Sequence, residues 1–428
     1  MQNWVLSELD SGERVISERL EHVRSAAVGY WIGAGSRDED GDEAGVTHFI
    51  EHLLFKGTER YSALEIAEIF DGLGGELNAA TAREHTLVYA RIPDHHLETA
   101  VEVMSDMVFA PAFVDLDAER EVVLEEIAMY EDAPQDLVHD LISEAVFGDH
   151  PLGRPVIGTA EVISSISADS VARYHDEKYV PGNIVVSAAG NVDHQQLLEL
   201  VERGLGRRAG NDGGPKVRPP LVQAPPPRLR FQRKDTEQYH VCLGAPGISR
   251  SDRRRFAASL LDAILGGSAS SRLFQEIREK RGLAYAVYSF VSQYTDTGQV
   301  GVYIGTREDN LAETLAITAE QIADIAGGNL PARELERAKE NLKGRILISM
   351  ESTSTRMNRL GKSLISDSEL LSLDRIVAEI DAVEAEAVCA LAATLLAQDK
   401  LSAACIGPNE DRLLAALERI APALAPAA

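Results

Sequence analysis

The residues best suited to chemistry in this sequence are His48, Glu51 and His52, which form the pattern H-x-x-E-H. On a helix, two histidines four residues apart lie on one face, where both imidazoles can bind the same zinc ion. Glu51 follows His48 by three residues and points to nearly the same side. A carboxylate beside the metal can act as a base toward water. The pattern therefore predicts a zinc-dependent peptide hydrolase, with two histidine ligands and Glu51 as the catalytic base.

The alternative interpretation of this segment is an amphipathic helix with two surface histidines. It explains the apolar residues of the segment, which are Phe49, Ile50, Leu53 and Leu54, but not why the polar residues form a zinc-binding pattern. The pattern seldom arises by chance in a chain with 11 histidines among 428 residues. We therefore favour the metal site.

A catalytic zinc ion needs a third protein ligand and keeps an open position for water. A strong helix is predicted over residues 116–131, and one of its stripes consists of Glu119, Val122, Val123, Glu126 and Tyr130. Because the stripe is otherwise apolar, it should face inward, where two carboxylates need a cation. We expect Glu126 to be the third ligand and Glu119 to orient a zinc-bound histidine. Glu125 is the main rival ligand, and a solvent-exposed helix rich in glutamate is the alternative to the whole interpretation.

The elements that must position these residues belong to a duplicated α+β fold. Residues 88–100 resemble residues 302–314, and residues 185–193 resemble residues 401–409; in each case a strand leads through a turn into a helix. A Gly- and Pro-rich stretch lies between the two halves. We predict two homologous domains, each a mostly antiparallel sheet packed with helices, over residues 1–209 and 229–428, joined by a linker at 210–228.

The local pattern of the first half is consistent with this fold. Residues 26–33 and 86–90 are strand-like, whereas residues 47–55 form the helix that carries the histidines. Ser62 and Glu65 have the spacing of a capping box that opens the next helix.

The charge and the cysteines restrict the possible partners and compartment. The formal net charge of −26 argues against nucleic acid and disfavours anionic membranes. The three cysteines, Cys242, Cys389 and Cys405, form no disulfide framework and fit a reducing compartment as buried thiols. The N-terminus lacks the pattern of a signal peptide, and no apolar run is long enough to span a bilayer. We expect a cytoplasmic protein.

Three segments give the chain a family resemblance over nearly its whole length: residues 35–37, 48–58 and 119–127. They resemble the inverzincin metallopeptidases, the family of pitrilysin, insulysin and mitochondrial processing peptidase, and most closely the bacterial processing-peptidase-like members. The resemblance implies one zinc ion per chain, with Glu126 as the third ligand and Glu119 in an assisting role. It also implies that the substrate lies along residues Asn78 and Ala79 as an added strand, a mode of binding that tolerates many sequences. His85, on the same segment, is expected to be structural or to support the ligands.

The second half keeps no H-x-x-E-H pattern, and its one histidine is His240. Aligning residues 336–337 with residues 119–120 puts Lys343 at the position of Glu126, so this half should bind no metal. The resemblance implies instead that Arg278 and Tyr285 hold the substrate backbone and support the tetrahedral intermediate. From the residues alone, they are as well explained by a basic helix end followed by a strand.

The resemblance also implies the assembly and the substrates. The two domains would form half of a clamshell, so we expect a homodimer with an internal chamber in which Arg278 and Tyr285 serve the partner's zinc. Enclosure favours unfolded peptides or presequence-like segments as substrates of this zinc endopeptidase. Two alternatives remain: a non-catalytic assembly subunit of the same fold, or an active subunit that needs a distinct inactive homologue in a heterodimer.

Overall fold

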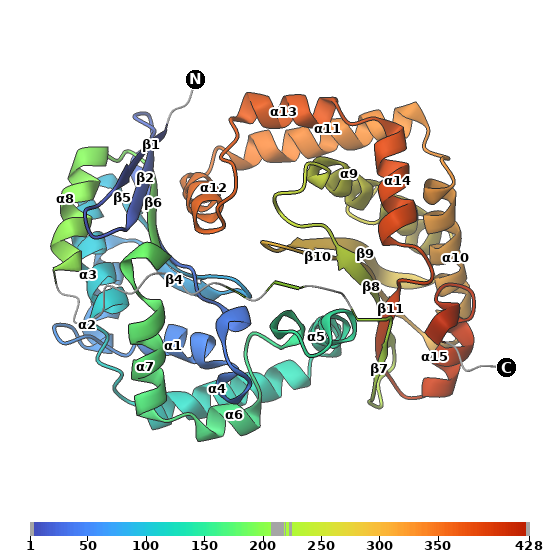
Figure 1. The fold of residues 1–428 in the computed structure, drawn as a ribbon, viewed down its shortest axis with the longest axis horizontal. Helices are drawn as coiled ribbons and strands as arrows, with labels where there is room; N and C mark the ends of the chain where they lie inside the picture. The colour runs from blue at the N-terminus through green and yellow to red at the C-terminus, as the bar shows by residue number, and fades with distance from the viewer. Residues whose placement is uncertain (1–3, 207–217, 219, 222–224, 425–428) are drawn as a thin grey trace. The chain divides into compact units, whose positions relative to one another are not determined.

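The computed structural model of the protein describes residues 4–206, 218, 220–221 and 225–424 (Figure 1). Most of the predicted linker at 210–228 therefore lies outside the described residues. The chain divides into two compact units, and each is assembled from three stretches of sequence: residues 1–128, 155–219 and 348–372 form the first unit, and residues 129–154, 220–347 and 373–428 form the second. The predicted division at 1–209 and 229–428 concerns the duplicated halves and stays a prediction.

The first unit is built on a six-stranded sheet in the order β1-β2-β6-β3-β5-β4. Its strands β2 and β6 are parallel, and all other neighbours are antiparallel. The strands are β1 (Trp4–Glu8), β2 (Arg14–Arg19), β3 (Ser25–Ile32), β4 (Glu76–Thr81), β5 (Thr86–Pro93) and β6 (Ile184–Gly190). The helices are α1 (Val46–Leu54), α2 (Ala63–Leu73), α3 (Leu97–Phe109), most of α4 (Leu116–Glu131), α6 (Ala160–Ser165), α7 (Ala168–Lys178), α8 (His194–Leu205) and α12 (Thr353–Ile365).

The second unit repeats this design with five strands in the order β7-β11-β8-β10-β9. Strands β7 and β11 are parallel, and the others are antiparallel. The strands are β7 (Leu229–Arg233), β8 (Tyr239–Gly247), β9 (Ala284–Gln293), β10 (Gly298–Thr306) and β11 (Ser402–Gly407). The helices are α5 (Pro134–Phe147), α9 (Arg255–Leu265), a π-helix (Phe274–Glu279), α10 (Glu308–Ala326), most of α11 (Ala332–Ser349), α13 (Leu373–Asp381), α14 (Ala385–Leu395) and α15 (Glu410–Leu417). The predicted α+β class, with two related and mostly antiparallel sheets, is confirmed.

Each sheet has helices on both faces, and one covering helix comes from the other half of the sequence. In the first unit, α12 packs on β3 and β6 through Met357 and Leu360, which lie against the buried Trp31 and Val185. In the second unit, α5 packs on β8 and β11. The first sheet thus buries one face under a helix from the second half of the sequence, and the second sheet buries one face under a helix from the first half.

Short-range signals account for several element boundaries. The capping box predicted at Ser62 and Glu65 opens α2, since each side chain bonds the other residue's backbone N–H. Single-turn 3₁₀ segments complete the connections, at Ser36–Asp38, Gly41–Glu43, Asp94–His96, Pro151–Gly153, Pro181–Asn183 and Pro422–Leu424. No helix among the described residues is both long and apolar enough to cross a membrane.

Candidate metal centre

Helix α1 holds the two histidines because its opposite face is anchored in the core. Phe49, Ile50, Leu53 and Leu54 are fully buried, whereas His48, Glu51 and His52 are partly exposed. A buried carboxylate fixes the start of the helix: Glu39 accepts hydrogen bonds from the backbone N–H groups of Gly45 at 2.8 Å and Thr47 at 2.9 Å. An anion at a helix N-terminus is favourable, because it satisfies free N–H donors and the helix dipole.

The structure brings His48, His52 and Glu126 together. One ligand atom from each of the three lies within 4.8 Å of the other two. Oε2 of Glu126 lies 3.7 Å from Nε2 of His48 and 3.3 Å from Nε2 of His52. Atoms that share a tetrahedral zinc ion at about 2.1 Å lie about 3.4 Å from one another. The two nitrogens and the oxygen therefore fit a zinc ion.

No other group of three or more His, Cys, Asp and Glu side chains among the described residues has this geometry. Glu125, the rival ligand, is exposed and is not part of the cluster. The stripe on α4 faces inward only in part, since Glu119 and Val123 are buried but Val122 is 49% exposed. The buried face is centred on residues spaced by four, and Val122 lies to one side of it.

Glu119 supports one of the two histidines. Its Oε1 lies 2.8 Å from Nδ1 of His52, and its Oε2 forms an ion pair with Nζ of Lys56. A carboxylate at Nδ1 holds the proton there and leaves the Nε2 lone pair of His52 free for a metal. His48 has no such support, because its Nδ1 is buried without a hydrogen-bond partner among the described residues.

The burial of the site changes the titration of two of its groups. Burial lowers the pKa of His48 from 6.5 to about 4, and the nearby charge of His52 adds to this. His48 is thus neutral at physiological pH, which is the form of the imidazole that can bind a metal. Burial also raises the pKa of Glu51, while hydrogen bonding from Thr81 and the charge of His52 oppose the rise. A raised carboxylate pKa suits a group that must accept and return a proton.

Strand β4 leads directly to the predicted base. It pairs with β5 and forms an edge of the sheet, and it carries the exposed Asn78 and the buried Ala79. At its end, the Thr81 hydroxyl donates to Oε2 of Glu51 at 2.5 Å. An edge strand offers free backbone groups to an added strand.

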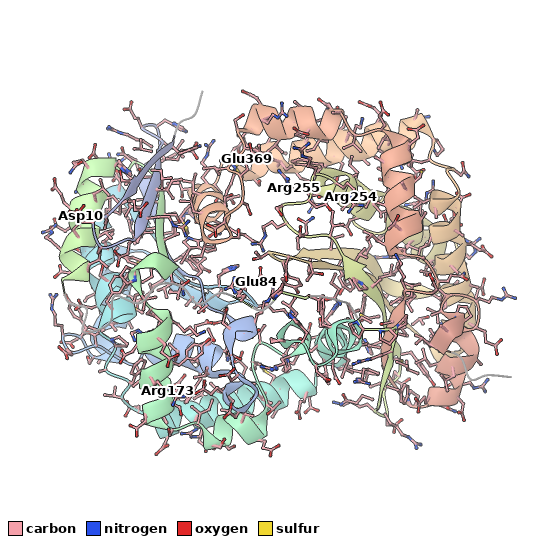
Figure 2. The ribbon with its side chains drawn as sticks, in the orientation of Figure 1. Asp10, Glu84, Arg173, Arg254, Arg255 and Glu369 are labelled. Atoms are coloured by element: carbon pink, nitrogen blue, oxygen red, sulfur yellow. The ribbon has the colours of Figure 1, made fainter. Side chains whose placement is uncertain are left out.

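The turn after β4 is held by a buried ion pair. Nη1 of Arg37 donates to Oε1 of Glu84, labelled in Figure 2, at 2.7 Å, and both side chains are buried. The backbone N–H groups of Ser36 and Arg37 donate to carbonyls of Ala82 and Arg83. His85, in the same turn, lies with its ring 5.2 Å from that of Trp31. These contacts fix the end of β4 and therefore the position of Thr81.

Arg278 and Tyr285 lie together in the second unit. The Arg278 guanidinium stacks 4.6 Å from the centre of the Tyr285 ring and 4.7 Å from that of Phe274. Tyr285 is 77% exposed at the start of the edge strand β9. Lys343, which sequence alignment sets opposite Glu126, is paired with Glu340 and Asp381. Sequence reasoning gave Lys56 and Thr81 no individual role, because neither belongs to the metal-binding pattern.

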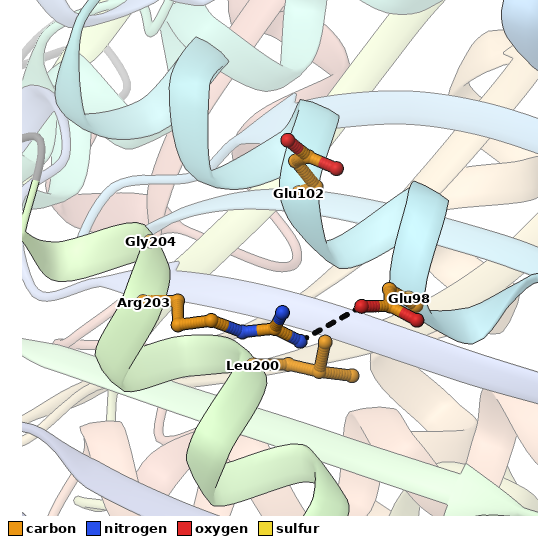
Figure 3. Close-up of a pocket in the computed structure, with 5 residues that line it drawn as sticks. All are labelled: Glu98, Glu102, Leu200, Arg203 and Gly204. Atoms are coloured by element: carbon orange, nitrogen blue, oxygen red, sulfur yellow. Dashed lines mark hydrogen bonds and ion pairs between the residues drawn. The ribbon is translucent and has the colours of Figure 1, made fainter.

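A small pocket elsewhere in the first unit does not resemble a catalytic site. It lies between α3 and α8, and its lining consists of Glu98, Glu102, Leu200, Arg203 and Gly204 (Figure 3). Its charges are already satisfied: Arg203 donates to Glu98 at 2.9 Å, and Glu102 accepts from Arg60 at 2.7 Å. The charged groups of these two pairs are therefore not available to bind a ligand in the pocket.

The chain is similar to known proteins along most of its length. A family model described as "Insulinase (Peptidase family M16)" matches residues 14–160, and one described as "Peptidase M16 inactive domain" matches residues 165–342. An uncharacterized zinc protease of Streptomyces coelicolor is 42% identical over 412 residues, which cover 94% of this chain and 89% of that protein. Another, from Bacillus subtilis, is 41% identical over 91% of this chain and 95% of its own length.

Solved structures share the fold. A peptidase M16 inactive domain from Pseudomonas fluorescens superimposes with a TM-score of 0.88 at 23% identity, covering 95% of this chain and 98% of its own. A protease from Helicobacter pylori gives a TM-score of 0.87 at 22% identity, over 95% and 99% of the two chains.

Proposed function

This chain belongs to the peptidase M16 family, and from that premise we propose that it is a zinc-dependent endopeptidase. The observation that supports this most directly is the cluster of His48, His52 and Glu126, whose ligand atoms lie within 4.8 Å of one another. Two imidazoles and one carboxylate form a donor set typical of catalytic zinc, and they leave a position for water. The relatives from Streptomyces coelicolor and Bacillus subtilis are named as uncharacterized zinc proteases, which agrees with this chemistry.

The reaction is peptide-bond hydrolysis, with Glu51 as general base and then general acid. Zinc held by the three ligands would polarise the scissile carbonyl and acidify the attacking water. Glu51 takes the proton from that water as it attacks the carbonyl carbon, and then delivers a proton to the leaving amine. The hydrogen bond from Thr81 engages one oxygen of Glu51 and leaves the other for the water.

The substrate is an extended peptide that binds through its main chain. Asn78 and Ala79 lie on the edge strand β4, to which a peptide can add as another strand on the way to Glu51. Arg278 and Tyr285 hold the substrate backbone and stabilise the oxyanion. We propose that these two residues act on the metal centre of a second copy of the chain. A chamber enclosed by two copies would admit unfolded peptides or presequence-like segments.

Zinc analysis coupled to cleavage of a peptide mixture tests the proposal. The purified protein should contain about one zinc ion per chain, since a catalytic site holds a single ion. Glu51→Gln should keep the metal and lose turnover, whereas His48→Ala should lose both. A chain without stoichiometric zinc, or one whose cleavage survives Glu51→Gln, would overturn the proposal. Zinc without turnover in the purified chain would favour a heterodimer with an inactive homologue.

A further inference from the structure

Lys56 lies just beyond the H-x-x-E-H helix, and its ammonium group reaches the carboxylate that supports His52. We propose that Lys56 is a positioning residue of the metal centre, which holds Glu119 so that His52 presents Nε2 to the zinc ion. The inference rests on the proposed function, because it concerns how this chain prepares its own ligands. Lys56 acts through Glu119 and touches neither the metal nor the substrate.

The two oxygens of Glu119 have different partners. Oε2 pairs with Nζ of Lys56, and Oε1 lies 2.8 Å from Nδ1 of His52. The Glu119 side chain is only 5% exposed, so water cannot replace a lost partner easily. With one oxygen held by the lysine, the carboxylate has a single orientation in which the other oxygen accepts the Nδ1 proton. This fixes both the ring plane and the tautomer of His52.

The backbone at Lys56 is fixed well enough for this task. Helix α1 ends at Leu54, and the N–H of Lys56 still donates to the carbonyl of Leu53 at 3.1 Å. Gly57 follows with a φ of 130°, which favours glycine, and the next residue pairs with Pro111 in an isolated β-bridge. The chain thus turns away immediately after Lys56, and the side chain of Lys56 is left to reach α4.

The two zinc-binding histidines are therefore prepared differently. Nδ1 of His52, the nitrogen that would face away from the metal, is held by Glu119, and Glu119 is held by Lys56. The corresponding nitrogen of His48 is buried without a hydrogen-bond partner among the described residues. The orientation of the site before metal binding depends on His52, so a change at Lys56 should reduce zinc affinity even though it removes no ligand.

Whether zinc affinity falls or rises when Lys56 is replaced distinguishes a positioning role from a purely electrostatic effect of its charge. Lys56 is a cation close to the site of a divalent cation, so its charge alone opposes zinc binding. If charge were its only effect, Lys56→Met would bind zinc more tightly than the wild type. If it positions Glu119, the same variant binds zinc more weakly.

The test measures zinc affinity by chelator competition in the full-length protein, for Lys56→Met, Lys56→Gln, Lys56→Arg, Glu119→Gln and the double variant Lys56→Met/Glu119→Gln. The two neutral variants of the lysine, Lys56→Met and Lys56→Gln, should bind zinc about tenfold more weakly, which is the lower end of the range for supporting residues of a metal site. Lys56→Arg keeps the charge and should retain most of the affinity. In the Glu119→Gln background, Lys56→Met should have no further effect. The absorption spectrum of the Co²⁺-substituted protein should change in the neutral variants. Arg19→Met, which removes an exposed cation from the same unit, is the control and should leave affinity unchanged.

Equal or tighter zinc binding by both neutral variants would overturn the inference, as would an undiminished effect of Lys56→Met in the Glu119→Gln background. Thermal unfolding of the metal-free variants shows whether they are folded, and the neutral variant with the wild-type melting temperature is the one to interpret. If the wild-type chain binds no zinc, the proposed function fails first. If it binds zinc and Lys56 has no influence, only this inference fails.

Discussion

The Thr81 hydroxyl donates a hydrogen bond to Glu51, with 2.5 Å between Thr81 Oγ1 and Glu51 Oε2. The end of the edge strand along which substrate is proposed to lie is therefore in direct contact with the residue that would move the proton. Removing the hydroxyl in Thr81→Val should free the carboxylate to rotate and lower kcat by about tenfold, equivalent to about 1.4 kcal/mol. Zinc content should stay at the wild-type level. Thr81→Ser, which keeps the hydroxyl, is the matched control, and equal kcat in the valine and serine variants would contradict the prediction.

The choice between adjacent glutamates on α4 can be tested directly. Glu126 lies within 3.7 Å of both histidine Nε2 atoms, whereas Glu125 is exposed and outside the cluster. Glu126→Gln should remove most of the zinc and all turnover, because a neutral amide is a much weaker ligand for zinc than a carboxylate. Glu125→Gln changes the same charge one residue away and should leave both unchanged. Metal analysis of the two variants would show the opposite pattern if Glu125 were the ligand.

The metal-free protein should lose stability as the pH falls from 6.5 toward 4. The pKa of His48 is lowered by burial from 6.5 to about 4, so within this window the unfolded chain binds a proton that the folded chain does not. Protonation therefore favours unfolding, and the contribution reaches about 3 kcal/mol near pH 4. Urea unfolding at a series of pH values would measure it. In His48→Gln this part of the pH dependence should disappear, and an unchanged slope would show that His48 is not its source.

The packing of α12 on the first sheet should tolerate no side chain at Gly361. A Cβ atom there would lie 1.9 Å from Nε1 of Trp31, whose N–H donates to Ser187 at 2.8 Å. Gly361→Ala should lower the free energy of unfolding by about 1–3 kcal/mol, as overpacking of a core does. Gly344→Ala is the control, since Gly344 lies in α11 with no atom within 4 Å of its Cβ position. It should stabilise slightly through helix propensity. A Gly361→Ala variant that melts at the same temperature as the wild type and Gly344→Ala would contradict the prediction.

The proposed exchange of residues between two copies predicts complementation. A Glu51→Gln chain lacks the base but keeps Arg278 and Tyr285, and an Arg278→Ala/Tyr285→Ala chain has the opposite defect. Each should be inactive alone, and mixed dimers should recover part of the peptide-cleaving activity, because one metal centre in each is complete. Size measurement must first establish that mixed dimers form. Inactive mixed dimers would show that the two sets of residues do not act across copies.

The sequence predicted those features that depend on short spacing. The H-x-x-E-H helix, the capping box at Ser62 and the helix from Leu116 to Glu131 are local patterns, and they lie within a residue or two of their predicted positions. The proximity of Glu126 to the histidines was also expected, because carboxylates on a stripe predicted to face inward need a cation as a partner.

Features that depend on tertiary packing could not be predicted in the same way. Lys56 and Thr81 are common residue types, and their roles follow from which side chain lies opposite. Val122 was expected to face inward, but α4 buries the neighbouring stripe instead. The packing of α5 and α12 on the sheets was also not predicted, because an amphipathic helix shows that it covers a surface but not which one.

The origin of α12 has a consequence for the order of events during synthesis. A ribosome that has translated the first 209 residues has made every proposed zinc ligand, but it has not made the helix that covers Trp31 and Val185. This face of the first sheet cannot be covered until Ile365 has left the exit tunnel, when most of the second half has already been made. The apolar residues of this face, Trp31 and Val185 among them, are therefore exposed on the nascent chain while most of the second half is being made.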